Sequence, residues 1–149
     1  MAAPALVALA PGCRDPRATQ TVTALVDEVR ATRPDLRIEK AFLESARPAL
    51  GTVVDRLVRA GHDEIVIVPL QLTDSEPVRD QISVAVTEVG TKHDQLKIRV
   101  TQALGLEACF LEVLDVRLRD ALREARVREL DALVLAADGS TDPLANQAV

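Results

Sequence analysis

The sequence predicts an α/β fold, a doubly wound parallel sheet covered by helices on both faces in a three-layer αβα arrangement. Two observations lead to this prediction. Short apolar runs of strand length alternate with longer segments whose apolar residues recur at helical spacing. The apolar runs are largely continuous, as is typical of parallel strands buried on both faces. Strands joined through helices pair in parallel by right-handed crossovers, so the predicted order is β-α-β-α-β-α-β-α-β.

Five apolar runs are predicted strands. The third is the clearest, because Ile65-Val-Ile-Val68 is β-branched throughout and such side chains favour extended backbone. The second and fourth runs contain more polar residues. In chain order, the predicted strands cover residues 5–10, 36–43, 64–72, 96–103 and 132–137.

The four segments between these runs are predicted helices. Their apolar residues keep to one helical face over residues 22–29, 50–57, 82–89 and 111–122. Asp15 followed by Pro16 predicts the N-cap and the first residue of the first helix. Gly61 and Gly90 stand where C-caps are expected for the second and third helices.

The predicted fold places function at one edge of the sheet. Ligands of doubly wound sheets bind outside the carboxyl ends of the strands. The loops expected at this edge cover residues 11–15, 44–48, 73–77 and 103–105. Residues that precede a strand lie at the opposite edge.

Composition excludes several classes of function. The 149 residues are 48% apolar and 28% charged, which is typical of one globular domain. Phe42 and Phe110 are the only aromatic residues, and the formal net charge is −5. Both features argue against nucleic acid as a partner, because nucleic-acid binders use basic surfaces and aromatic stacking platforms.

From its cysteines and hydropathy we expect the chain to be cytoplasmic. Cys13 and Cys109 do not make a disulfide framework, and no CxxC motif is present. No apolar run is long enough to span a bilayer, so no membrane association is expected. The apolar start of the chain lacks the basic residues of a signal peptide.

The end of the chain repeats its beginning. Residues 5–22 align with residues 132–149, and ten of these eighteen positions agree, including Gly12 with Gly139. We interpret this as a domain duplication. The predicted organisation is one α/β domain over residues 1–130, followed at 131–149 by a last strand and the start of a second, truncated repeat. The alternative is a fifth strand that ends in a common turn.

The loop sequence Leu9-Ala-Pro-Gly-Cys-Arg-Asp-Pro-Arg-Ala18 resembles the His-Gly-Ser-Arg-Asp-Pro turn of the sirohydrochlorin chelatases. These are the class II cobalto- and ferrochelatases of cobalamin and siroheme synthesis. Ala41-Phe-Leu-Glu44 resembles the end of that family's second strand. Ala60-Gly-His-Asp-Glu-Ile-Val-Ile-Val-Pro-Leu70 resembles the start of its third strand, and Asp138-Gly-Ser-Thr-Asp-Pro143 the opening of a second half.

The resemblance implies a flavodoxin-like chelatase fold that inserts Co²⁺ or Fe²⁺ into a polycarboxylate tetrapyrrole. It implies no organic cofactor, and a homodimer or a fused pair of domains. The family carries two histidines that handle metal and protons, but Pro11 and Pro77 stand at those positions here. Proline has no ligand atom in its side chain, so whether the chain is an enzyme stays open. His62 and His93 each precede a predicted strand, at the opposite edge, as expected for surface residues near helix ends.

A rebuilt metal site is one hypothesis for the carboxyl edge. A thiolate with carboxylates can hold a divalent metal, and the candidate ligands there are Cys13, Glu44, Asp74 and Glu76. Glu44 matches the family pattern and is also the candidate catalytic residue. In the alternative interpretation Cys13 is a small buried residue, Asp74 and Glu76 are solvated turn residues, and Glu44 caps the following helix.

Three arginines are the candidate substrate-binding residues. Arg14, Arg47 and Arg79 are expected at the same edge, where guanidinium groups would suit a polycarboxylate ligand. Otherwise they are solvated surface residues.

Three functions therefore remain open. The first is a chelatase that handles a divalent metal and a tetrapyrrole. The second is a catalytically inactive relative that binds tetrapyrrole or pairs with an active chelatase. The third is the half of a longer two-domain chelatase that lacks the histidines.

Overall fold

The computed structural model describes residues 3–72, 76–104, 108–127 and 130–134. Its elements follow the predicted alternation of strand and helix. In chain order they are β1 (Ala5–Ala10), α1 (Pro16–Thr32), β2 (Ile38–Phe42), α2 (Leu50–Arg59), β3 (Glu64–Pro69), α3 (Glu76–Lys92), β4 (Lys97–Val100) and α4 (Ala108–Ala125).

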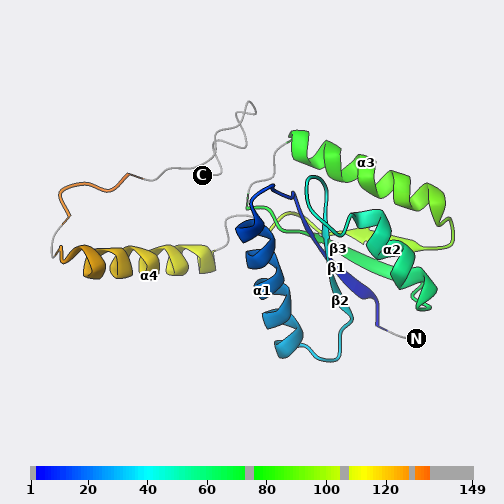
Figure 1. The fold of residues 1–149 in the computed structure, drawn as a ribbon, viewed down its shortest axis with the longest axis horizontal. Helices are drawn as coiled ribbons and strands as arrows, with labels where there is room; N and C mark the ends of the chain where they lie inside the picture. Colours follow the sequence, from blue (N-terminus) through cyan, green and yellow to red (C-terminus); the bar gives the residue numbers. More distant parts are fainter. Residues whose placement is uncertain (1–2, 73–75, 105–107, 128–129, 135–149) are drawn as a thin grey trace.

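The four strands form one parallel sheet in the order β2-β1-β3-β4. Helix α1 covers one face of this sheet, and α2 and α3 cover the other (Figure 1). This is the predicted α/β class with helices on both faces. Each observed strand lies within its predicted run, and β2, β3 and β4 are shorter than predicted.

The larger core lies between the sheet and the pair α2 and α3. Strand β3 shows why, because Ile65 and Ile67 point to this side and are fully buried, whereas Val66 and Val68 on the other side are only partly buried. Leu57 of α2 and Val89 of α3 belong to the same core. The smaller core under α1 contains Ala8, Val26 and Ile38.

Two predicted helix caps are confirmed. The Asp15 carboxylate accepts a hydrogen bond from the backbone N–H of Arg17 at 2.9 Å, and Pro16 is the first residue of α1. At the end of α2, Gly61 has φ +89°, and its N–H donates to the carbonyl of Val58. The N–H of His62 donates to the carbonyl of Leu57. These two bonds make a Schellman motif, in which glycine adopts the left-handed conformation at no steric cost.

The prediction that Gly90 ends the third helix is wrong. Helix α3 continues to Lys92, and the N–H of His93 donates to the carbonyls of Val89 and Gly90. Gly90 instead lies beside β4, where a β-carbon would touch only Ile98 Cδ1, at 3.9 Å. This is an ordinary van der Waals distance, so the contact with β4 does not require glycine.

Helix α4 extends away from the sheet (Figure 1). Its apolar residues Leu111, Val113, Leu114 and Val116 are all at least half exposed. None of the helices in the described ranges is long and apolar enough to cross a membrane.

The predicted fifth strand is not seen where the structure can test it. Residues 132–134 form no strand, and Val134 is 86% exposed. The rest of that segment, and most of the proposed second repeat at 131–149, lies outside the described residues. The domain division therefore stays a prediction.

Candidate active site

The loops that follow β1 and β2 meet at the carboxyl edge of the sheet. The parallel pairing of the two strands continues beyond their ends, because the N–H of Leu43 donates to the carbonyl of Ala10 and the N–H of Glu44 to that of Pro11, both at 3.0 Å. Glu44 is therefore held by its backbone against the first loop, the position predicted for it from the sequence.

Gly12 makes this approach possible. It has φ +93°, and a β-carbon built on it would lie 1.8 Å from the carbonyl oxygen of Glu44. No other residue fits there without moving one of the two loops. Ser45 also has a positive φ, 54°. The N–H of Ala46 donates a hydrogen bond to the carbonyl of Glu44 at 2.6 Å. Both loops are thus shaped around the backbone of Glu44.

Glu44 lines a pocket of about 380 Å³ between the second loop and one side of α3. Asp80 and Glu88 of α3 line the same pocket, one on either side of Val84 along the helix. Three carboxylates around one pocket make its potential negative, which attracts a cation. Glu44 does not cap the following helix, because the N-cap of α2 is Ala49 and no side-chain hydrogen bond is made there.

The proposed thiolate and carboxylate cluster is not assembled in the described part of the chain. Cys13 is exposed, contrary to the buried alternative, and its sulfur accepts the N–H of Asp15 at 3.4 Å. Glu76 is exposed at the start of α3. No group of three or more potential metal ligands is found among the described residues, which include Cys13, Glu44 and Glu76. Asp74 lies outside the described residues.

The three candidate arginines do not share one pocket wall. Arg14 and Arg47 are exposed on the first and second loops at the carboxyl edge, as predicted. Arg79 lies on α3 but lines a different pocket, on the side of the helix that faces β4. Arg14 and Arg47 therefore remain the two candidate arginines on the loops that meet at Glu44.

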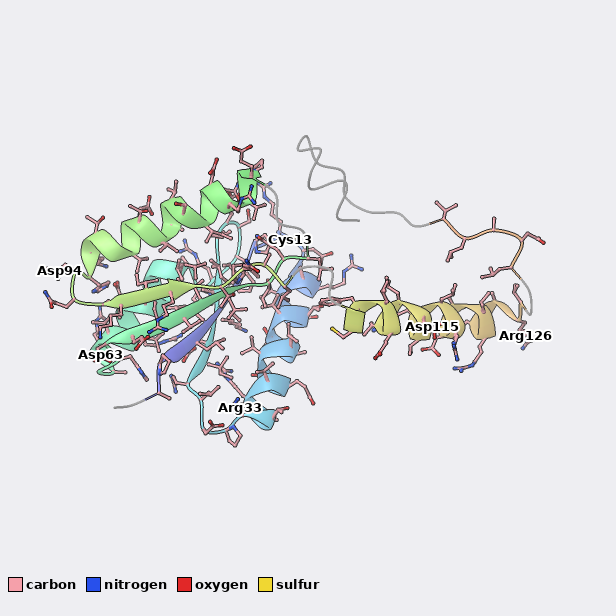
Figure 2. The ribbon with its side chains drawn as sticks, turned by 180° about the vertical axis from the view of Figure 1, so that it is seen from behind. Cys13, Arg33, Asp63, Asp94, Asp115 and Arg126 are labelled. Atoms are coloured by element: carbon pink, nitrogen blue, oxygen red, sulfur yellow. The ribbon has the colours of Figure 1, made fainter. Side chains whose placement is uncertain are left out.

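Both histidines lie at the opposite edge, as predicted. His62 follows α2 and His93 follows α3, each just before a strand. Figure 2 shows the neighbouring Asp63 and Asp94 far from Cys13. His93 is partly buried rather than on the surface, and its Nε2 lies 2.7 Å from Asp55 Oδ1. The hydrogen bonds from Lys92 and His93 hold the pKa of the Asp55 carboxyl below its usual value.

Three residues that line the two pockets beside α3 are not among the candidates predicted from the sequence. Asp80 and Glu88 lie within a predicted helix, and the pattern alone did not show which side faces Glu44. Gln71 lines the pocket on the β4 side and is 9% exposed. The sequence does set Gln71 apart, because it is the one amide residue in the apolar run 64–72.

The fold and this acidic pocket define the class of protein, a doubly wound α/β domain whose candidate site lies at the carboxyl ends of its strands. The sequence profile of the CbiX family matches residues 5–126. The chain therefore belongs to the CbiX family, the chelatase family that its loop motifs resemble.

One curated relative is named sirohydrochlorin cobaltochelatase and comes from Priestia megaterium. It is 26% identical over 110 residues, which are 73% of this chain and 36% of the relative. The present chain thus spans about a third of that protein.

Solved structures share the fold. A CbiX protein of cobalamin (vitamin B12) biosynthesis from Marinobacter aquaeolei VT8 matches with TM-score 0.65 and 23% identity, over 83% of this chain and 98% of its own. SirB from Bacillus subtilis with Fe³⁺ matches with TM-score 0.72 and 22% identity, over 78% of this chain and 46% of its own. The sirohydrochlorin chelatase SirB from the subspecies spizizenii, in complex with cobalt, matches with TM-score 0.73 and 22% identity, over 78% and 50%.

Proposed function

We propose that this chain binds a polycarboxylate tetrapyrrole of the sirohydrochlorin type at the carboxyl edge of its sheet and delivers Co²⁺ or Fe²⁺ into it. The observation that carries the proposal is the pocket where Glu44 of the β2–α2 loop joins Asp80 and Glu88 of α3. Family membership supports it, as do the relative named as a cobaltochelatase and the SirB complexes with cobalt and Fe³⁺.

Carboxylates can assist metal insertion in two ways. Insertion of a divalent metal into a free tetrapyrrole exchanges two pyrrole N–H protons for the cation. Carboxylate oxygens can hold the incoming cation near the macrocycle, and a carboxylate at the edge can take up a released proton. Glu44 is the residue we assign to both tasks, with Asp80 and Glu88 adding to the negative potential of the pocket.

Arg14 and Arg47 are proposed to bind the carboxylate arms of the substrate. Both are exposed on the loops that frame Glu44. Guanidinium groups make charge-assisted, often bidentate bonds to carboxylates. A second copy of the chain, or a partner chelatase domain, is proposed to close the cleft, because a lone unit leaves one wall open.

The test is the rate of Co²⁺ insertion into sirohydrochlorin by the Glu44→Gln variant. Glutamine keeps the shape of the side chain but removes its charge and basicity, so the rate should fall by about a hundredfold. Glu28→Gln is the matched control, because Glu28 is exposed late in α1, towards the opposite edge. Equal rates for the wild type and Glu44→Gln would contradict the assignment of Glu44.

A second function is favoured by one specific observation. Pro11 and Pro77 stand where the family has its metal- and proton-handling histidines, and Pro77 is the second residue of α3. This substitution favours a relative that binds tetrapyrrole without inserting metal, alone or as one half of a paired chelatase. Binding of sirohydrochlorin with a metal-insertion rate equal to the protein-free rate would select this function.

A further inference from the structure

Helix α3 has a pocket on each side. Residues 80, 81, 84, 85 and 88 line the pocket of Glu44. Residues 79, 82, 83, 86 and 87 line a second pocket of about 420 Å³. At about 100° per residue these two sets lie on opposite sides of the helix. The second pocket, bounded by the ends of β3 and β4, is therefore separate from the pocket of Glu44.

The second pocket is mostly apolar. Ile82 and Val86 of α3 line it on one side, and Val100 of β4 on the other. Val100 is 44% exposed although it belongs to the sheet, because β4 is the edge strand among the described strands. An exposed apolar wall of this kind suits the apolar body of a ligand.

Among the residues that line the pocket, Gln71 is the one buried polar residue. Its side-chain nitrogen and oxygen are both buried, and neither has a hydrogen-bond partner within the described ranges. Its backbone carbonyl has a partner, because it accepts a hydrogen bond from the N–H of Leu104 at 2.9 Å. A buried carboxamide without partners is unfavourable, because it has lost its bonds to water and gained none.

We propose that the α3–β4 pocket binds a small ligand with an apolar body and a neutral carboxamide head, and that Gln71 is its hydrogen-bonding anchor. The Gln71 amide has both an unpaired donor and an unpaired acceptor. A ligand carboxamide offers one of each, whereas an ionised carboxylate only accepts and would place its charge against Gln71 Oε1. Both amide atoms are buried in the structure, so the proposal requires the Gln71 side chain to rotate and bring its amide into the pocket when the ligand binds.

Arg79 provides a reason to expect the opposite preference, for an anionic ligand. It lines the same pocket, and a guanidinium group attracts a carboxylate. If Arg79 governed recognition, the pocket would prefer an anion. If Gln71 governs it, the pocket prefers the neutral amide.

The experiment compares benzamide with benzoate, which share an aromatic body and differ in the head group. Both are titrated to millimolar concentration into the ¹⁵N-labelled full chain, and the Gln71 side-chain NH₂ signal is followed by NMR. Benzamide should shift this signal saturably and bind about tenfold more tightly than benzoate, the ratio expected when one buried hydrogen-bonding group is left unpaired.

The variant Gln71→Met removes the amide and nearly keeps the side-chain volume. It should lower benzamide affinity about tenfold and abolish the preference for the amide. Its unchanged backbone spectrum would show that the fold is intact. Gln102→Met is the matched control, because Gln102 lines the same pocket but is exposed, so the preference should survive. Equal or tighter binding of benzoate, no saturable shift with benzamide, or a preference that survives Gln71→Met would each overturn the proposal.

Discussion

At the scale of single residues, the backbone contact between Gly12 and Glu44 determines the shape of the candidate active site. The conformation of Gly12 is left-handed, and the carbonyl of Glu44 occupies the space where a side chain would begin. The residue proposed to act on substrate is thus positioned by a residue that has no side chain.

We predict that Gly12→Ala destabilises the protein by about 2 kcal/mol or more, because it combines a positive φ with a steric clash. Gly51→Ala is the matched control. Gly51 lies in α2, and a β-carbon there would meet nothing within 4 Å beyond its own helix, so alanine should stabilise the helix by up to about 1 kcal/mol. Urea denaturation measures both changes. Equal stability of Gly12→Ala and the wild type would contradict the close approach of the two loops.

Residue types that act locally could be predicted from the sequence. Asp15 and Gly61 cap their helices because a cap depends only on neighbouring backbone groups. Glu44 was placed at the correct edge for a similar reason, since it directly follows a strand. Its partners Asp80 and Glu88 could not be predicted, because they depend on how α3 is rotated against the second loop.

At the scale of the elements, Asp55 ties α2 to the end of α3. Its carboxylate accepts a hydrogen bond from Lys92 Nζ at 2.7 Å and contacts His93 Nε2 at the same distance. These bonds favour the ionised carboxylate, so the pKa of Asp55 is lower in the folded chain than in the unfolded one.

The pH dependence of stability follows from this lowered pKa. The contribution of Asp55 is present above its unfolded pKa and is lost as the pH falls through the lower, folded pKa. We predict that Asp55→Asn is less stable than the wild type at about pH 6 and that the difference shrinks towards about pH 3. Urea denaturation at the two pH values checks this. A difference that stays constant with pH would show that charge at Asp55 does not contribute.

The helices differ in how much they are buried, and paired truncations measure this. Leu57 of α2 is 1% exposed, so Leu57→Ala should cost about 3 kcal/mol. Leu114 of α4 is 50% exposed, so Leu114→Ala should change the free energy of unfolding by no more than about 0.5 kcal/mol. A large loss for Leu114→Ala would show that α4 packs against the sheet in solution.

The location of each element was predictable, but only some of the ends of the elements were. Apolar periodicity marked the four strands and four helices that the structure describes. It failed at Gly90, because a glycine can lie within the last turn of a helix as well as follow it, and α3 continues to Lys92.

At the scale of the whole molecule, the class of fold could be predicted, because it depends on the alternation of strands and helices. The strand order β2-β1-β3-β4 could not, since it depends on which strands pair across the chain. Among the described strands, the same pairing leaves β4 at an edge, where Val100 lines the pocket of Gln71. The sequence showed Gln71 only as a polar residue in an apolar run.

The net charge of −5 and the acidic pocket both make the electrostatic potential at the candidate site negative. Negative potential raises the local concentration of a divalent cation, but it opposes a polyanionic tetrapyrrole. The proposed function therefore needs Arg14 and Arg47 at the loops to bind the carboxylate arms, while the negative potential of the pocket attracts the metal.

The central claim is that this member of the CbiX family handles both tetrapyrrole and metal without the two family histidines. The most direct test is a titration of the purified chain with sirohydrochlorin, with and without Co²⁺, followed by the absorbance of the tetrapyrrole. We expect the metallation shift to develop faster than in a protein-free control. Binding of sirohydrochlorin without any acceleration, or no binding at all, would contradict the claim.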